Sequence, residues 1–338
     1  MHHRLGATDP VTSSRQARGG ARCSPALKRE EERCNAQPQR RSLLVSAPNR
    51  PFSLNIFLPD GTPEGVRIIG KSNWTGCGVY FPRSMFREAR KRVEFSRTGV
   101  YILVGPSDDQ GLPTIYIGQG DVVVDRLNQH YSKRDFWTWC VYFVAKDESL
   151  NRAHVQHLEA RLLQLAAEAK RCSLDNSAVP NLPHLSEADA ADVESFLSDI
   201  LSILPLVGLN VFEKPKRATR TQQAFHIRAK GIEATGHETP DGFVIRKGSE
   251  VVTTEAKSIH GYLSALRRDL TQQGVLEISR DSLRFVQDYS FGSPSTAAGV
   301  VLGRSANGRI EWKTTDSKTL KDLQEAEVPG AEGQQTPS

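Results

Sequence analysis

Five side chains have types and spacings that could build a cleft for a ligand. Two are tyrosines, Tyr101 and Tyr116, each in a short β-branched segment with a glycine nearby. Arg126 follows ten residues after Tyr116, and His130 comes four residues later, so both can lie on one face of a helix. Glu159 lies at the edge of the apolar stripe of the next helical segment, where a carboxylate is either half-buried or turned toward a cleft. Together these residues offer phenol, guanidinium, imidazole and carboxylate groups.

Each of these residues alone also has a purely structural interpretation. Tyrosines in strands usually pack in the core, and an arginine on a helix is usually solvated. His154 and His157 lie near Glu159 in the sequence, but the three positions do not share one helix face. We therefore do not expect a three-ligand metal site there. Only the combination of residues indicates a function.

The elements that must position these residues are visible in the hydrophobic pattern. Residues 98–104 and 114–118 predict two strands joined by a polar turn, which is typical of a hairpin. Asp121 is expected to cap a helix that runs through His130. Further along the chain the pattern predicts a strand at 136–144, a helix at 150–170 and a helix at 186–204 that begins at Ser186.

The expected fold class is α/β, of the α+β type, with a small antiparallel central sheet flanked by helices. We assign this domain to residues 97–212. The segment 49–96 predicts a small β-rich unit packed on it, with a helix near 82–93. The other segments are a disordered basic tail at 1–48, a basic linker at 213–224, an α+β module at 225–323 and a disordered tail at 324–338.

Charge and composition exclude several classes of protein. The chain has 338 residues and a net charge of +5, but residues 1–50 hold ten Lys and Arg against four Asp and Glu. The rest of the chain is therefore nearly neutral, and any nucleic-acid contact must rest on local patches. The five cysteines form no CxxC pair, and no apolar run reaches the ~18 residues of a membrane span. We expect a soluble cytoplasmic protein without membrane contact.

The order of these motifs resembles the GIY-YIG nuclease superfamily. The two tripeptides read Gly99-Val100-Tyr101 and Tyr116-Ile117-Gly118, followed by Arg126 and Glu159. A closer resemblance is to members with an Asn-Trp-Thr-Gly segment, here residues 73–76, and an appended C-terminal module of unknown function. The motifs of that module are at 291–295 and 301–308.

The resemblance implies a DNA endonuclease that uses one divalent cation, Mg²⁺ or Mn²⁺. Glu159 would hold the metal, together with waters and phosphate oxygens. Arg126 would contact the non-bridging phosphate oxygens. Tyr101 and Tyr116 would frame the attacking water, one of them as general base, and His130 would orient that tyrosine or relay its proton.

The resemblance also assigns less specific residues. Asn176 is the candidate for a late asparagine that fixes the cleft, although Asn181 competes for this role. Gln119 stands where many members carry lysine. Gln119, Lys133 and Arg134 are candidate DNA contacts, whereas the aromatic residues at 136–139 are expected to be core. The arginines at 267, 268 and 304 suggest that the C-terminal module recognises DNA or a protein partner.

The energetics of the tyrosine mechanism impose a condition on the fold. A phenol has a pKa near 10, so acting near pH 7 requires a shift of about three units, or roughly 4 kcal/mol. One tyrosine must therefore lie against Arg126 and near the metal held by Glu159. The alternative hypothesis is a non-catalytic nucleic-acid-binding or protein-interaction module on a degenerate nuclease fold. The sequence contains no GxGxxG or P-loop motif that would indicate a nucleotide cofactor.

Overall fold

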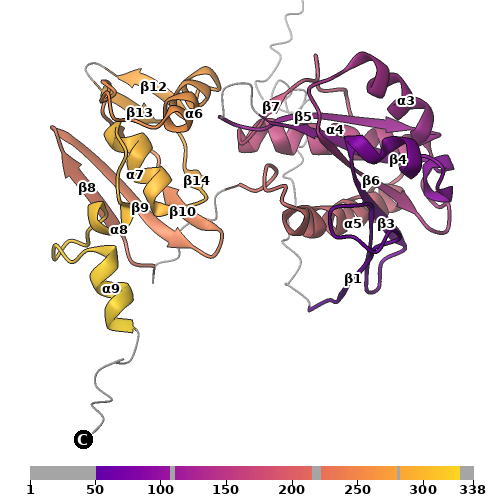
Figure 1. Cartoon of the computed structure of the whole chain (residues 1–338), viewed down its shortest axis with the longest axis horizontal. Coiled ribbons are helices and arrows are strands. Elements are labelled where there is room, and N and C mark those ends of the chain that lie inside the picture. The colour runs from indigo at the N-terminus through magenta and orange to yellow at the C-terminus, as the bar shows by residue number, and fades with distance from the viewer. Residues whose placement is uncertain (1–50, 107–110, 215–221, 280–281, 328–338) are drawn as a thin grey trace, which may run out of the picture. The chain divides into compact units, whose positions relative to one another are not determined.

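A computed structural model describes residues 51–106, 111–214, 222–279 and 282–327. The fold is mixed α+β, with sheets flanked by helices (Figure 1). The expected disordered tail at 1–48, most of the basic linker and residues 328–338 lie outside the described residues. None of the helices in the described ranges is long and apolar enough to cross a membrane.

The first part of the described chain forms a seven-stranded sheet with the order β1-β2-β3-β6-β4-β5-β7. All neighbouring strands are antiparallel except β5 and β7, which are parallel. The strands are β1 (Leu54–Phe57), β2 (Arg67–Lys71), β3 (Gly76–Pro82), β4 (Gly99–Gly105), β5 (Thr114–Gly120), β6 (Trp139–Ala145) and β7 (Ser173–Leu174).

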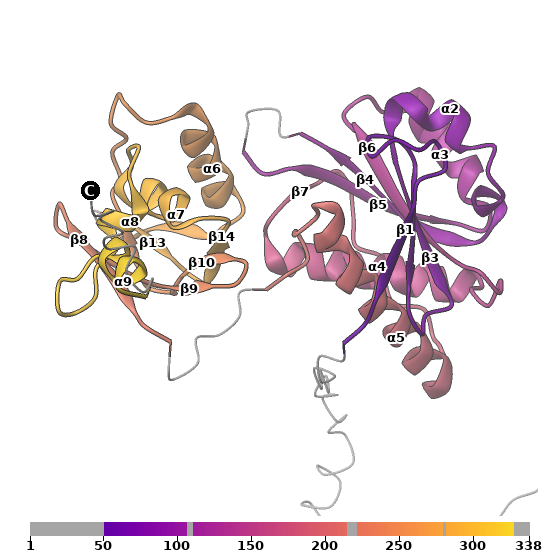
Figure 2. The same ribbon diagram turned by 60° about the horizontal axis from the view of Figure 1, so that its bottom comes forward.

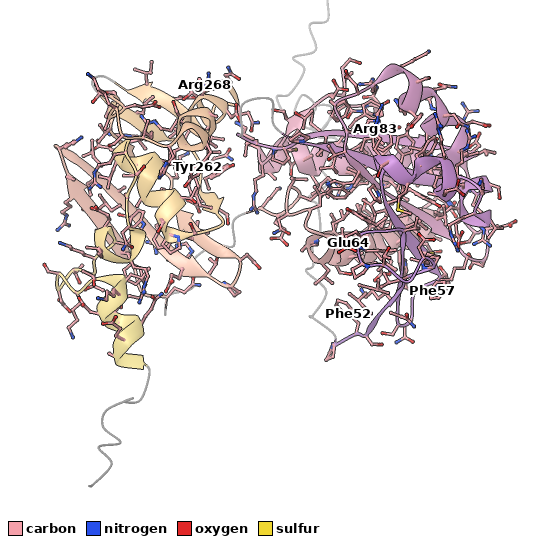
Figure 3. The ribbon with its side chains drawn as sticks, in the orientation of Figure 1. Phe52, Phe57, Glu64, Arg83, Tyr262 and Arg268 are labelled. Atoms are coloured by element: carbon pink, nitrogen blue, oxygen red, sulfur yellow. The ribbon has the colours of Figure 1, made fainter. Side chains whose placement is uncertain are left out.

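The segment 49–96, expected to form a small β-rich unit packed on the domain at 97–212, contributes its strands to the sheet of that domain. Strand β3 pairs with β6 over its whole length, from Gly76 opposite Ala145 to Pro82 opposite Trp139. Strands β1 and β2 continue the same sheet outward. The central sheet is therefore larger than expected, because β6 has β4 on one side and offers its other edge to β3. Phe52 and Phe57, at the free edge, are exposed (Figure 3).

The helices beside this sheet agree with the sequence pattern except in two places. The helices are α2 (Phe86–Ala89), α3 (Val123–Lys133), α4 (Arg152–Ala169) and α5 (Glu187–Ile203). Ser186 caps α5, as predicted, by accepting a hydrogen bond from the Asp189 amide. Asp121 does not cap α3, because the helix begins two residues later with Val122 at its N-cap. The helix expected near 82–93 is split into α2 and two 3₁₀ turns, at 83–85 and 93–96.

The sheet separates two hydrophobic layers because neighbouring side chains of a strand point to opposite faces. Ile102 and Ile117 pack with α4 and α5, whereas Tyr101 and Leu103 pack with α2 and α3. Figure 2 shows the two pairs of helices on opposite sides of the sheet. Trp137 is fully buried in the layer under α3, which confirms the expected core position for this residue. Phe136 and Trp139 are only partly buried, and the strand expected from residue 136 begins at Trp139.

The C-terminal segment forms a four-stranded and a three-stranded antiparallel sheet with helices. The first has the order β14-β10-β9-β8 and the second the order β11-β13-β12. The elements are β8 (Phe225–Ala229), β9 (Ile232–Thr239), β10 (Gly242–Ile245), β11 (Glu250–Val251), α6 (Gly261–Gln272), β12 (Leu276–Ser279), β13 (Ser282–Phe285), β14 (Tyr289–Phe291), α7 (Pro294–Leu302), α8 (Gly308–Glu311) and α9 (Leu320–Glu327). Helix α9 thus extends past residue 323, into the segment expected to be disordered.

The motifs of this module hold its own fold together. Ser293 caps α7 with Pro294 in the first turn, and Asn307 caps α8. Gly303 has φ +62°, and an added Cβ there would lie 2.7 Å from the Thr254 carbonyl oxygen. These positions therefore need no ligand to explain them.

Two of the arginines proposed for partner recognition are engaged inside the module. Arg267 is buried, forms an ion pair with Glu255 and donates hydrogen bonds to the carbonyls of Val252 and Val300. Arg304 pairs with Glu311 at 2.6 Å. The expectation that Arg267 contacts a partner was therefore wrong. Arg268, its neighbour, is exposed (Figure 3).

Candidate active site

The two tyrosines lie on neighbouring strands of one hairpin, as predicted. In the register of β4 and β5, Tyr101 stands opposite Gly118 and Leu103 stands opposite Tyr116. The Tyr101 side chain lies across Gly118, where an added Cβ would come within 2.4 Å of the phenol oxygen. The glycine of Tyr-Ile-Gly therefore makes room for the tyrosine of Gly-Val-Tyr. This contact explains why the two tripeptides occur together.

His130 joins the two tyrosines from helix α3. Its Nε2 and the Tyr101 hydroxyl oxygen are 2.8 Å apart, which forms a buried hydrogen bond. The imidazole centre lies 4.7 Å from the centre of the Tyr116 ring, and the two tyrosine rings are 6.3 Å apart. The helix positions His130 because Leu127, one turn earlier, anchors the same face in the core.

Burial keeps both members of this hydrogen bond uncharged near neutral pH. Burial lowers the pKa of His130 to about 4, and the positive charges of Arg134, Arg126 and Lys133 act in the same direction. Burial raises the pKa of Tyr101 well above its ordinary value, although the Arg126 guanidinium opposes this rise. Tyr101 and His130 therefore share a hydrogen bond between neutral groups.

Arg126 is on helix α3, one turn before His130. Its positive charge opposes the rise that burial causes in the pKa of both Tyr101 and Glu159. The side chain runs past Gly120, where an added Cβ would lie 3.1 Å from the Arg126 Cγ. The residue itself is exposed, so its charged group is accessible to a ligand.

A pocket of about 330 Å³ brings together residues from four segments of the chain. Its lining includes Tyr116 from β5, Arg134 after α3, Glu159 from α4 and Asn176 from the loop after β7. Helix α4 covers the sheet face opposite to the one that carries Tyr101. Glu159 nevertheless shares the pocket with Tyr116, because the pocket lies at the β5 side of the sheet, where β7 pairs only with Thr114 and Ile115. The structure thus brings the carboxylate and one phenol together.

The Glu159 carboxylate is suited to a divalent cation. Burial raises its pKa, and Arg126 opposes the rise. Within the described ranges, no group donates a hydrogen bond to this half-buried carboxylate. Mg²⁺ is commonly held by one or two carboxylates with waters and substrate phosphate oxygens, so this donor set fits such an ion. The described residues include no cluster of three or more His, Cys, Asp or Glu side chains that would hold a metal without a substrate.

The two histidines of α4, His154 and His157, have hydrogen-bond partners other than Glu159. His154 completes the helix cap with Asn151, and the His157 Nε2 lies 2.7 Å from a Glu194 carboxylate oxygen. Glu194 is on α5, which packs against α4.

Asn176 is hydrogen-bonded to the backbone of strand β5. Its Nδ2 donates to the Ile117 carbonyl at 2.8 Å, and its Oδ1 accepts from the Ile117 amide at 3.0 Å. Both hydrogen bonds fix the backbone beside Tyr116. Asn181 is exposed and does not line the pocket, so the structure selects Asn176 of the two candidates.

The three candidate DNA contacts lie in different surroundings. Gln119 lies three residues after Tyr116 on β5, so its side chain points to the other face of the sheet, the face covered by α4. It pairs with Val100 of β4. Lys133 is exposed at the end of α3. Arg134 is not a free surface residue, because it forms an ion pair with Asp175 and its guanidinium lies 4.3 Å from the centre of the Tyr116 ring.

Asp175 is the pocket residue that the sequence analysis missed. It lies 41 residues from Arg134, and no motif or helical spacing connects them. Its position directly before Asn176 is the only sequence feature that could have drawn attention to it.

Comparisons with known proteins address the C-terminal module. Residues 225–324 match the family model of a domain of unknown function (DUF4357). These bounds agree within one residue with the module expected from the sequence at 225–323. No curated protein and no solved structure gives a significant match to the chain.

Proposed function

We propose that the protein is a divalent-metal-dependent DNA endonuclease of the GIY-YIG type. The observation that carries this proposal is the pocket at β5, which is lined by Tyr116, Glu159 and Asn176. Arg126 does not line this pocket, but its positive charge opposes the rise in the pKa of Glu159. A phenol and a half-buried carboxylate at one opening, with the charge of Arg126 acting on that carboxylate, are groups that hydrolysis of a phosphodiester can use. The resemblance of the two tripeptides supplies DNA as the substrate.

In this proposal Glu159 holds Mg²⁺ or Mn²⁺. When bound, the cation stabilises negative charge on the scissile phosphate and on the leaving oxygen. Arg126 binds the non-bridging oxygens through its planar guanidinium. Asn176 keeps β5 fixed, so that Tyr116 stays at the pocket wall.

The two tyrosines have different roles. Tyr116 lines the pocket. In this proposal it first releases its phenolic proton to solvent, and its phenolate oxygen then takes the proton from the attacking water. Tyr101 is fully buried, and burial holds its proton on the phenol. Tyr101 and His130 therefore act as a neutral support behind Tyr116, and His130 contacts both rings.

The test is a cleavage assay on supercoiled, linear and branched DNA with Mg²⁺, with Mn²⁺ and with a chelator. Glu159→Gln should abolish detectable cleavage while the thermal melt stays unchanged. Tyr116→Phe should slow cleavage about 10²–10⁴-fold, because it removes the general base and keeps the ring. Glu168→Gln is the matched control, since this carboxylate is on the same helix, half-exposed and paired with Lys214. It should cleave like the wild type.

Two outcomes would contradict the proposal. Wild-type protein that leaves all DNA forms intact with both cations, yet binds them, would be a non-catalytic binding module. Cleavage that survives Glu159→Gln would place the metal or the chemistry elsewhere.

A further inference from the structure

Arg134 occupies an unusual position beside the pocket. Its guanidinium stacks over the Tyr116 ring at 4.3 Å and is paired on another side with the Asp175 carboxylate. We propose that Arg134, anchored by Asp175, is a positioning residue that holds the Tyr116 phenol in place for the reaction, and is not a DNA contact. This inference rests on the proposed nuclease function.

The backbone amide and carbonyl of Arg134 are both hydrogen-bonded. Its amide donates to the His130 carbonyl at 2.9 Å and ends helix α3. Its own carbonyl accepts a hydrogen bond from the Arg83 guanidinium, which also donates to the Tyr131 carbonyl. Arg83 stacks on the buried Trp137 at 4.6 Å. The side chain of Arg134 therefore extends from a fixed point toward Tyr116.

The acidic partner is fixed to the same strand as the tyrosine. The Asp175 amide donates to the Ile115 carbonyl at 2.8 Å, and Asn176 binds Ile117 on the other side of Tyr116. The Arg134 guanidinium thus contacts Tyr116 of β5 and also Asp175, which is hydrogen-bonded to β5 at Ile115. A planar cation in this position restricts rotation of the partly exposed Tyr116 ring.

The surroundings of Arg134 do not favour a phosphate contact. One side of its charge is already compensated by Asp175, and one face is covered by the tyrosine ring. Lys133, the neighbouring residue, is exposed and provides the comparison. The two residues should therefore differ in how they affect turnover and DNA affinity.

The experiment measures kcat, KM and the salt dependence of DNA binding for Arg134→Gln, Arg134→Lys, Asp175→Asn and Lys133→Gln. Arg134→Gln should lower kcat about 10-fold or more, with KM and the salt slope close to wild type. Arg134→Lys should not restore kcat, because an ammonium group cannot stack and pair as a planar fork does. Asp175→Asn should lower kcat in the same direction without weakening DNA binding.

Lys133→Gln should instead weaken binding and reduce the slope of log K against log salt by about 1, as loss of one phosphate contact does. The same result for Arg134→Gln would overturn the inference and make Arg134 a DNA contact. An unchanged kcat in both Arg134→Gln and Asp175→Asn would also overturn it. If Arg134→Gln does not fold, Asp175→Asn decides.

A readout without catalysis separates this inference from the proposed function. In protein with ¹³C-labelled tyrosine rings, the Tyr116 resonance is assigned by its loss in Tyr116→Phe. Arg134→Gln should shift this resonance, whereas Glu168→Gln should leave it in place. If wild-type protein cleaves no DNA, the nuclease proposal fails alone. If the Tyr116 resonance does not move in Arg134→Gln, the positioning role fails whatever the activity.

Discussion

Replacing Gly118 with alanine should destabilise the sheet strongly, although the change adds only one methyl group. An ideal Cβ at this position would lie 2.4 Å from the Tyr101 hydroxyl oxygen and 2.5 Å from its Cζ. Tyr101 is fully buried and hydrogen-bonded to His130, so it has no free space to move into. Either the ring or the β4–β5 pairing must shift.

The size of the effect follows from these contacts. Overpacking a core position costs about 1–3 kcal/mol, and a strained or broken Tyr101–His130 hydrogen bond adds about 1 kcal/mol. Alanine gains roughly 0.5–1 kcal/mol over glycine in a strand. The expected net loss is about 1–3.5 kcal/mol of unfolding free energy.

Urea unfolding followed by tryptophan fluorescence measures this loss. Gly70→Ala is the matched control, because a Cβ on that β2 glycine meets no atom closer than 3.8 Å. The control should be neutral or slightly stabilising. In a Tyr101→Ala background the cost of Gly118→Ala should largely disappear. Equal stability of Gly118→Ala and Gly70→Ala would refute the packing argument.

Three further predictions concern charges in the core. The ¹H NMR titration of His130 should have its midpoint near pH 4. Because the unfolded chain already binds this proton below about pH 6.5, the unfolding free energy should fall as the pH drops from about 6.5 toward 4. A midpoint above about pH 6 would contradict the burial argument. Burial alone would raise the pKa of Glu194, but hydrogen bonds from His157 and Arg161 lower it to about 2. The wild type should therefore lose stability relative to Glu194→Gln as the pH falls from about 4.5 toward 2. Thermal melts recorded across this pH range measure the difference. Arg267→Met should cost about 3 kcal/mol in urea unfolding, because Glu255 loses its cationic partner and two buried carbonyls lose their donor. The substitution Arg268→Met, at an exposed position, should change stability by less than about 0.5 kcal/mol. Equal effects would argue against the buried ion pair.

Local patterns in the sequence were sufficient for most elements near the site. The alternation of apolar residues gave the β4–β5 hairpin, and the i, i+4 spacing placed Arg126 and His130 on one helix. Ser186 marked the start of α5. These features depend on residues within one or two turns, so the chain encodes them in short segments.

The sequence did not reveal where the first strands belong. Strand β3 pairs with β6, about sixty residues further along the chain, and any β-branched segment offers the same hydrogen-bonding groups. The failure of Asp121 as a cap is similar, because Val123 is drawn into the core and sets where α3 begins. Long-range packing decided both cases.

For the candidate site, the sequence by itself determined which chemical groups are present and in what order, including the pairing of a tyrosine with a glycine on each strand. Only the tertiary structure decided that Tyr101 is buried against His130, that Tyr116 lines the pocket with Glu159, and that Arg134 and Asp175 meet over the ring. Burial and charge pairing depend on which surfaces come together, and those contacts join residues that are distant in the chain.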